Sequence, residues 1–159
     1  MARPVEKREH IEHGMLTVVA RKGLRGSTIQ EIAEAASVSP GLLYRYWKSR
    51  DDLAVEVYRK NYAALTQRLA GLALSERDAS RRLALLVRTF LSYADEHPLV
   101  LRFLLLSQHD LARSVPTEFG VRAMVERVLR DGVEQGTFRP VPPGLGLQLL
   151  LGLVLQPVV

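Results

Sequence analysis

The stretch TIQEIAEAASVSPGLLYRYW, residues 28–47, predicts two short helices joined by a tight turn. Thr28 can cap the first helix, and Glu31, three residues later, completes a capping box. Small side chains in the turn let a second helix approach at a steep angle. Ser39 is the predicted N-cap of that second helix, and Pro40 suits its first turn because the missing N–H would have no helical partner there. The stretch is therefore interpreted as a helix-turn-helix.

The second helix, predicted over residues 40–47, has an outer surface suited to a phosphate backbone. Leu43 and Trp47 lie four residues apart and are the predicted buried anchors. The other side chains face outward, include hydroxyl and guanidinium groups, and are followed by Lys48 and Arg50. Such groups donate hydrogen bonds to phosphate oxygens, as do the free N–H groups at a helix N-terminus.

Matching residues extend on both sides of this motif, and their spacing is specific. They are Arg8, Ile11, Gly23, Ser27-Thr28, Ile32-Ala33, Val38-Ser39, Gly41, Leu43-Tyr44, Tyr46-Trp47, Ser49-Arg50 and Leu53. The pattern resembles the N-terminal DNA-binding domain of the TetR (tetracycline-repressor-like) family of transcriptional regulators. That family usually has Gly, Lys and Phe where this chain has Ser37, Pro40 and Trp47. It also has Lys-Glu in place of Arg50-Asp51.

The resemblance implies a homodimeric repressor that binds a palindromic double-stranded DNA operator and is released by a small effector. The residues expected to hold phosphates are Thr28, Tyr44, Tyr46, Lys48 and Arg50. Those expected to face the major groove are Ser39, Pro40, Gly41, Leu42 and Arg45. Arg45 is the best candidate for base reading, because a guanidinium can bond both acceptors of guanine.

Composition is compatible with this interpretation. The 159 residues are long enough for two small helical domains, and 47% of them are hydrophobic. A net charge of +5 and a pI near 9.9 permit nucleic-acid binding without requiring it. Cysteine is absent, which excludes disulfides and thiolate metal sites. The charged N-terminus lacks the apolar core of a signal peptide, so we expect a cytoplasmic protein.

Apolar residues recur at helical spacing along the whole chain, and no strand-like alternation occurs. Helices are predicted at residues 5–22, 49–73, 81–96, 98–108, 117–135 and 145–155, with a loop at 109–116. The predicted fold is all-α. It comprises an N-terminal three-helix helix-turn-helix DNA-binding domain, residues 1–51, and a C-terminal helical ligand-binding and dimerisation domain, residues 52–159.

The last predicted helix, Leu145 to Leu155, is apolar on nearly every side. It is too short for a membrane span, so no membrane partner is expected. Such a helix either fills a core or forms a subunit interface, and an interface within a homodimer is the favoured alternative. The resembling family normally has one more helix after it. This chain is therefore expected to be either a short member or a C-terminally truncated one.

Aromatic side chains on inward faces are the candidate effector contacts. They are Tyr58, Tyr62, Phe90, Tyr93, Phe103 and Phe119. Pockets between the helices of a bundle commonly hold small molecules, although plain core packing is the more frequent use of aromatic residues. Few charges fall on the inward faces, so the expected effector is largely apolar.

Other classes of function have less support. Neither a Gly-rich phosphate loop nor a nucleophile elbow occurs, so no enzyme is predicted. His10 and His13 lie three residues apart but lack further ligands, so they are interpreted as surface residues, and neither a metal nor a cofactor is expected. The alternative to the regulator is a helical dimerisation or adaptor module whose basic head binds an acidic protein partner.

Overall fold

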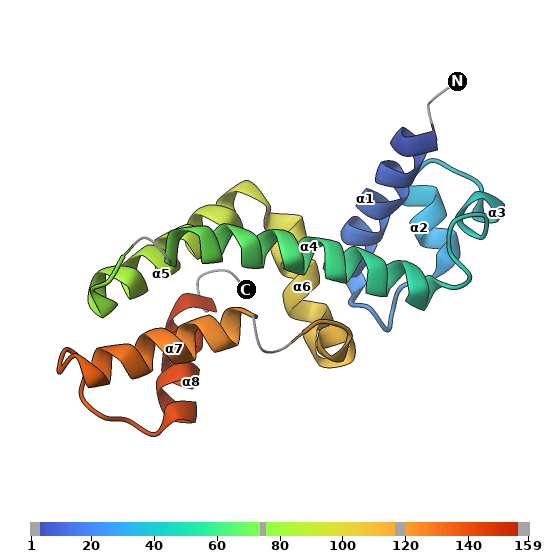
Figure 1. Cartoon of the computed structure of the whole chain (residues 1–159). Coiled ribbons are helices and arrows are strands. Elements are labelled where there is room, and N and C mark those ends of the chain that lie inside the picture. Colours follow the sequence, from blue (N-terminus) through green and yellow to red (C-terminus); the bar gives the residue numbers. More distant parts are fainter. Residues whose placement is uncertain (1–3, 74–75, 117–119, 156–159) are drawn as a thin grey trace. The chain divides into compact units, whose positions relative to one another are not determined.

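The structure of the chain is a computed structural model that describes residues 4–73, 76–116 and 120–155. Every regular element in these ranges is helical, which confirms the predicted all-α fold (Figure 1). In chain order the elements are α1 (Pro4–Lys22), α2 (Ile29–Ala35), α3 (Pro40–Leu43), α4 (Arg50–Ala73), α5 (Ala79–Glu96), α6 (Pro98–Leu111), the 3₁₀ helix η1 (Ala112–Ser114), α7 (Val121–Glu134) and α8 (Pro143–Leu155). None of the helices within the described ranges has the length and apolar character needed to cross a membrane.

The chain packs as two compact units. The first, which we call the head, contains Met1–Tyr62 and Leu99–Ser114; the second, which we call the core unit, contains Ala63–Pro98 and Val115–Val159. These units are defined by how tightly residues pack and not by function, so they do not test the predicted boundary of the DNA-binding domain. The functional boundary between residues 51 and 52 therefore stays a prediction.

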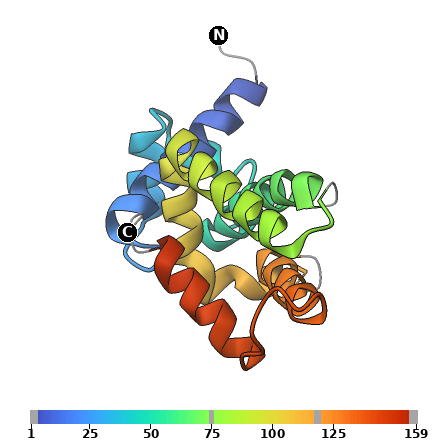
Figure 2. The same cartoon turned by 90° about the vertical axis from the view of Figure 1, so that its left-hand side faces the viewer.

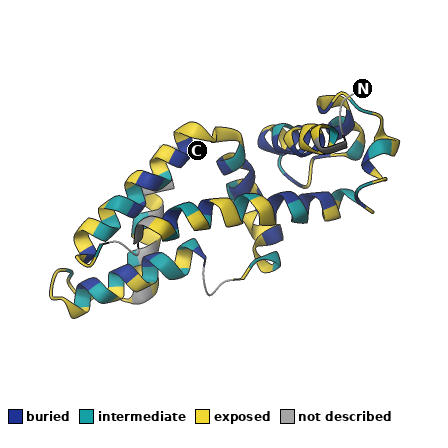
Figure 3. Ribbon diagram, turned by 45° about the horizontal axis from the view of Figure 1, so that its top comes forward, coloured by how far each residue is buried: buried dark blue, intermediate teal, exposed yellow. Residues whose placement is uncertain are grey.

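The head is built around α1, whose apolar residues recur at helical spacing. Four of them are fully buried, as predicted: Ile11, Met15, Val18 and Val19. Figure 3 shows that α1 carries exposed residues as well, as expected of a helix with one face in a core. The backbones of α1 and α2 approach closely at Gly14, where an added Cβ would lie 2.8 Å from the carbonyl oxygen of Ile32.

The first helix of the helix-turn-helix begins with the predicted capping box. The Thr28 hydroxyl accepts a hydrogen bond from the Glu31 N–H at 3.3 Å, and the Thr28 N–H donates to Glu31 Oε2 at 3.2 Å. Lys22 also pairs with the Glu31 carboxylate. This hydrogen bond is the main cause that lowers the pKa of the Glu31 carboxyl. Local sequence alone thus determines where α2 starts.

The turn after α2 places a serine in a conformation that favours glycine. Ser37 has a φ of +55°, in the left-handed region. Its N–H donates to the Glu34 carbonyl at 2.9 Å, and the Val38 N–H donates to the Ala33 carbonyl at 2.9 Å. These two bonds form a Schellman motif, in which the left-handed residue is usually Gly.

Replacing Ser37 with glycine is expected to raise the free energy of unfolding by about 1 kcal/mol, because glycine adopts the left-handed region without steric cost. Thermal denaturation followed by circular dichroism measures the change. Ser80, in the first turn of α5, is a matched control. Ser80→Gly should instead lower stability, by about 0.5 kcal/mol. A Ser37→Gly variant that melts at or below the temperature of the wild type would contradict this account of the turn.

The second helix of the motif is shorter than predicted. α3 ends at Leu43, and the predicted helix over residues 40–47 is wrong beyond that point. The Arg45 N–H donates to the Leu42 carbonyl at 3.2 Å, and the Tyr46 N–H donates to the Leu43 carbonyl at 3.0 Å. This three-residue spacing is that of turns and 3₁₀ segments. Ser39 occupies the N-cap as predicted, but its side chain makes no capping hydrogen bond.

The region after Gln108 also differs from the prediction. A loop was predicted at residues 109–116, whereas α6 continues to Leu111 and η1 extends to Ser114. Arg25 bonds the Asp110 carboxylate at 2.8 Å, and Arg59 Nε donates to the Ser114 carbonyl at 2.7 Å. Both partners are distant in sequence, so no local pattern could have indicated them.

The core unit contains the end of α4 together with α5, α7 and α8. α7 packs against both α5 and α8, and α8 crosses α7 steeply in Figures 1 and 2. α5 begins two residues earlier than predicted, because the Asp78 side chain accepts from the Arg81 N–H at 2.8 Å and caps the helix. Arg82 joins α5 to α7 through an ion pair of 2.8 Å with Asp131. α7 begins after Gly120, and its predicted start at residue 117 lies outside the described residues.

Candidate nucleic-acid interface and effector cavity

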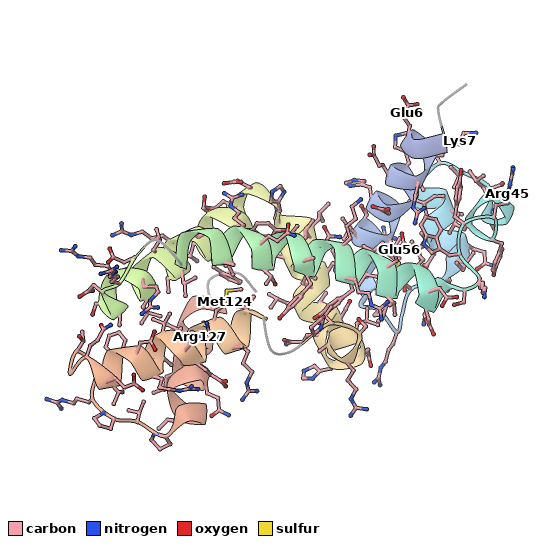
Figure 4. All side chains as sticks on the ribbon, viewed as in Figure 1. Glu6, Lys7, Arg45, Glu56, Met124 and Arg127 are labelled. Atoms are coloured by element: carbon pink, nitrogen blue, oxygen red, sulfur yellow. The ribbon has the colours of Figure 1, made fainter. Side chains whose placement is uncertain are left out.

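The ten predicted DNA contacts lie on or beside the helix-turn-helix, and we call them the recognition surface. Seven are exposed: Thr28, Ser39, Pro40, Gly41, Tyr44, Arg45 and Lys48. Leu42, Tyr46 and Arg50 are half-buried. Tyr44 is an aromatic side chain with 58% of its surface exposed, and Figure 4 shows Arg45 at the outer edge of the head. These residues are available to a ligand, whereas the predicted anchors Leu43 and Trp47 are buried.

Arg50 differs from the rest of this set. Its Nη1 donates to the carbonyls of Ser27 at 2.7 Å and Leu24 at 3.2 Å. Its Nε and Nη2 both bond the Asp51 carboxylate, at 3.0 and 2.7 Å. The guanidinium thus ties the loop between α1 and α2 to the start of α4. These hydrogen bonds use four of the five N–H groups of the guanidinium, so a phosphate contact from Arg50 would fall to the second N–H of Nη2.

The predicted effector contacts do not gather in one place. Tyr58, Tyr62 and Phe103 form an aromatic cluster within the head, with ring centroids 5.8 Å apart for the two tyrosines and 6.3 Å for Tyr58 and Phe103. Burial raises the pKa of Tyr58 to about 12, and Tyr62 adds a smaller effect. Phe119 lies outside the described residues. These three residues pack against one another in the head, and their role as effector contacts stays a prediction.

Tyr93 belongs to the core unit and takes part in a polar contact. The Arg68 guanidinium lies 5.8 Å from the centre of the Tyr93 ring and forms two hydrogen bonds, of 2.6 and 2.7 Å, with the Glu96 carboxylate. The hydrogen bonds from Arg68 and then Ser92 lower the pKa of Glu96 to about 2. Burial raises the pKa of Tyr93. These interactions hold α4 against α5.

An apolar cavity lies within the core unit. The space at this site not filled by atoms is about 450 Å³, part of which is open to solvent, so the cavity is a partly open one. The residues that line it are Leu69, Leu86, Val87, Phe90, Val121, Met124, Val125 and Leu150. Among the described residues, Phe90 is the member of the predicted effector set that lines this cavity. Met124, also in the lining, is labelled on α7 in Figure 4. Such a surface can accept an alkyl or other apolar group but offers no hydrogen bond.

A sequence profile of known proteins matches the head. The profile described as "Bacterial regulatory proteins, tetR family" matches residues 16–57, which include the whole helix-turn-helix. The chain belongs to the TetR family. Its relatives are transcription regulators, so this TetR-family chain is a transcription regulator and not an enzyme.

The likeness to individual TetR-family regulators extends beyond the head. The HTH-type transcriptional repressor KstR2 of Mycolicibacterium smegmatis is 26% identical over 147 residues, which are 87% of this chain and 71% of the repressor. The fatty acid metabolism regulator protein of Bacillus subtilis is 24% identical over 143 residues, 86% of this chain and 74% of that protein.

A solved structure has the same fold. The transcriptional regulator FadR from Bacillus subtilis, in complex with stearoyl-CoA, aligns with a TM-score of 0.70 at 19% identity. The alignment covers 94% of this chain and 84% of that one.

Proposed function

We propose that this TetR-family chain is a homodimeric repressor that binds a palindromic operator and leaves it when a small, largely apolar effector fills the cavity. The observation that carries the proposal is that one chain has both an exposed recognition surface and a cavity whose described lining residues are all apolar. Under this proposal the protein works in the cytoplasm, on the DNA that it regulates.

The recognition surface divides into two groups under this proposal. Hydroxyl and ammonium groups hold phosphates and fix the position of the head on the duplex, and they belong to Thr28, Tyr44, Tyr46 and Lys48. The residues that enter the major groove are Ser39, Pro40, Gly41, Leu42 and Arg45. Arg50 supports the loop behind this surface, and its predicted phosphate contact is secondary to that role.

Homodimerisation is proposed through α8. Leu145 and Leu149 on this helix have 45% and 58% of their surface exposed. A second copy of the chain that covers them would remove apolar surface from water and place two recognition surfaces on one duplex. Two-fold symmetry then predicts half-sites whose centres are separated by whole helical turns.

The proposed effector carries an alkyl chain. The lining residues that the structure describes are all apolar, so affinity would come from burial of hydrocarbon. The structural neighbour from Bacillus subtilis is complexed with stearoyl-CoA, which makes a long-chain acyl thioester the first ligand to test. Such a ligand can release DNA only to the extent that it binds the released state more tightly.

Fluorescence anisotropy tests the proposal directly. The protein is titrated against labelled duplexes from its own upstream region and against scrambled duplexes, at several salt concentrations, with stearoyl-CoA or free coenzyme A added. Sequence-selective binding that stearoyl-CoA reverses and coenzyme A does not would support the repressor. Weak binding that is indifferent to sequence and disappears with salt would favour the adaptor module with a basic head.

Arg45→Ala is expected to weaken binding to the operator about ten- to hundredfold, because a bidentate contact to one base contributes about 1–3 kcal/mol. Discrimination between operator and scrambled DNA should fall as well. Arg21→Ala is the matched control, since Arg21 is also an exposed arginine of the head but lies at the end of α1. Equal losses from both variants on both duplexes would show that Arg45 supplies charge alone.

A further inference from the structure

We propose that Glu56 is a positioning residue for DNA binding, which orients the last part of the recognition segment through Trp47 and Arg8. Glu56 lies on α4 and belongs to none of the predicted DNA contacts (Figure 4). This inference deepens the proposed function and rests on it, since positioning matters only if the head binds DNA.

The three side chains form one compact cluster within the head. The indole N–H of Trp47 donates a hydrogen bond of 3.0 Å to Glu56 Oε2. Arg8, on α1, bonds Glu56 Oε1, and its guanidinium lies 5.1 Å from the centre of the Trp47 ring. The hydrogen bond to Glu56 is the main cause that raises the pKa of the Arg8 guanidinium. One carboxylate thus serves two donors from different parts of the chain.

Trp47 makes this arrangement necessary. Only 5% of its surface is exposed, so its indole N–H needs a partner within the protein. The phenyl ring that the family usually has at this position carries no such donor. Glu56 supplies the acceptor from the second turn of α4 and thereby fixes the orientation of the Trp47 ring.

A second carboxylate, that of Glu12, connects Arg8 on α1 to α4. Glu12, one turn after Arg8 on α1, is buried and lies 3.7 Å from Arg8 Nε. Lys60, one turn after Glu56 on α4, pairs with Glu12 at 2.5 Å. Charges of alternating sign therefore link α1 to α4 beside Trp47.

The recognition segment depends on this tether because it has little helix of its own. α3 ends at Leu43, and residues 44–46 are held by turns. Tyr44, Arg45 and Lys48 all lie within three residues of Trp47. A rotation of the Trp47 ring would therefore move the backbone from which these proposed contacts extend.

Charge alone predicts the opposite effect of removing Glu56. Loss of a carboxylate makes the head more positive, which by itself strengthens binding to DNA. If Glu56 positions the recognition segment, its removal should weaken binding instead. The sign of the change thus separates the two explanations.

The experiment compares Glu56→Leu and Glu56→Gln with the charge control Glu9→Gln, since Glu9 is an exposed carboxylate on α1. Operator affinity is measured by anisotropy across a salt series, and folding is checked by thermal denaturation. Acrylamide quenching of Trp47, the sole tryptophan, reports the mobility of its ring in the absence of DNA.

We expect Glu56→Leu to weaken operator binding about tenfold, the factor that corresponds to one hydrogen bond to a charged group. The slope of affinity against salt should stay the same, because no phosphate contact is removed. Trp47 should become easier to quench. Glu56→Gln, which still offers an acceptor to the indole but none of the charge that Arg8 needs, should fall between the wild type and Glu56→Leu. Glu9→Gln should bind as well as the wild type or better.

The inference is overturned if the wild type binds its operator selectively and a folded Glu56→Leu or Glu56→Gln variant binds equally well or more tightly. A Glu56→Leu variant that fails to fold leaves the decision to Glu56→Gln. If the wild type itself shows no selective binding, the proposed function is wrong, and the inference falls with it because Glu56 then has no DNA contact to position.

Discussion

Replacing Gly14 with alanine is expected to lower the free energy of unfolding of the head by about 2 kcal/mol, because the added methyl group overpacks the contact between α1 and α2. A Cβ at this position would lie 2.8 Å from the Ile32 carbonyl oxygen and 3.1 Å from the Ala36 backbone nitrogen. Backbone atoms cannot rotate away as a side chain can, so α2 as a whole must shift. Because α2 leads into α3, operator binding should weaken too.

The expected direction is opposite to the usual effect of this substitution. Within a helix, alanine is favoured over glycine by about 1 kcal/mol. Gly71 is the matched control, since it also lies inside a helix and an added Cβ would meet no atom within 4 Å. Gly71→Ala should therefore raise stability by up to about 1 kcal/mol.

Urea denaturation of Gly14→Ala is followed by Trp47 fluorescence, which reports the head because this sole tryptophan lies there. Gly71 lies in the core unit, so the control is followed by far-UV circular dichroism, which reports the helices of the whole chain. A Gly14→Ala variant that is as stable as the wild type would mean that the two helices can separate at little cost, and that Gly14 is not required for their packing.

Local features were the part of the fold that sequence could predict. The capping box of Thr28 and Glu31 needs only neighbouring residues, and so do the glycines that end α1 and α7. Gly23 and Gly136 have φ values of +74° and +70°, which is the conformation that follows a helix end. The predicted C-terminal ends of α3 and α6 were wrong, because turns and contacts with residues distant in sequence determine where these helices end. Asp110, for example, is held by Arg25.

The recognition surface could be predicted as far as helical periodicity separates buried residues from exposed ones. Burial of Leu43 and Trp47 leaves Tyr44 and Arg45 exposed, as predicted. Periodicity could not indicate the contacts of Arg50, whose carbonyl partners Leu24 and Ser27 belong to another loop.

The cavity was harder to predict for a related reason. The sequence indicates which face of a helix is buried, but a cavity depends on how the side chains of α4, α5, α7 and α8 fill the space between these helices. Phe90, from the predicted aromatic set, does line this cavity, whereas Met124 and Val125 line it without having been predicted as effector contacts. Gly14 did carry a signal, since a glycine inside a helical pattern often marks a close approach of two backbones.

Replacing Leu149 with glutamate is expected to convert a dimer to monomers and to weaken binding to a full palindromic operator about 10²- to 10⁴-fold, the range that linkage of two binding sites contributes. Leu149 has 58% of its surface exposed on α8, so the substitution should not disturb the fold of a single chain. A carboxylate at a subunit interface, however, would lose its hydration without gaining a partner. Light scattering measures the mass, and anisotropy measures the affinity.

Leu106→Glu is the matched control, because Leu106 is a leucine with 44% exposure on a different helix, α6, and the change in charge is the same. If repulsion between the new carboxylate and DNA were the cause, both variants would bind a single half-site more weakly. Loss of the dimer predicts that Leu149→Glu binds a half-site as the wild type does and loses affinity for the full palindrome alone. A Leu149→Glu variant that remains dimeric would exclude α8 as the interface, since a buried glutamate at that position could not be accommodated there.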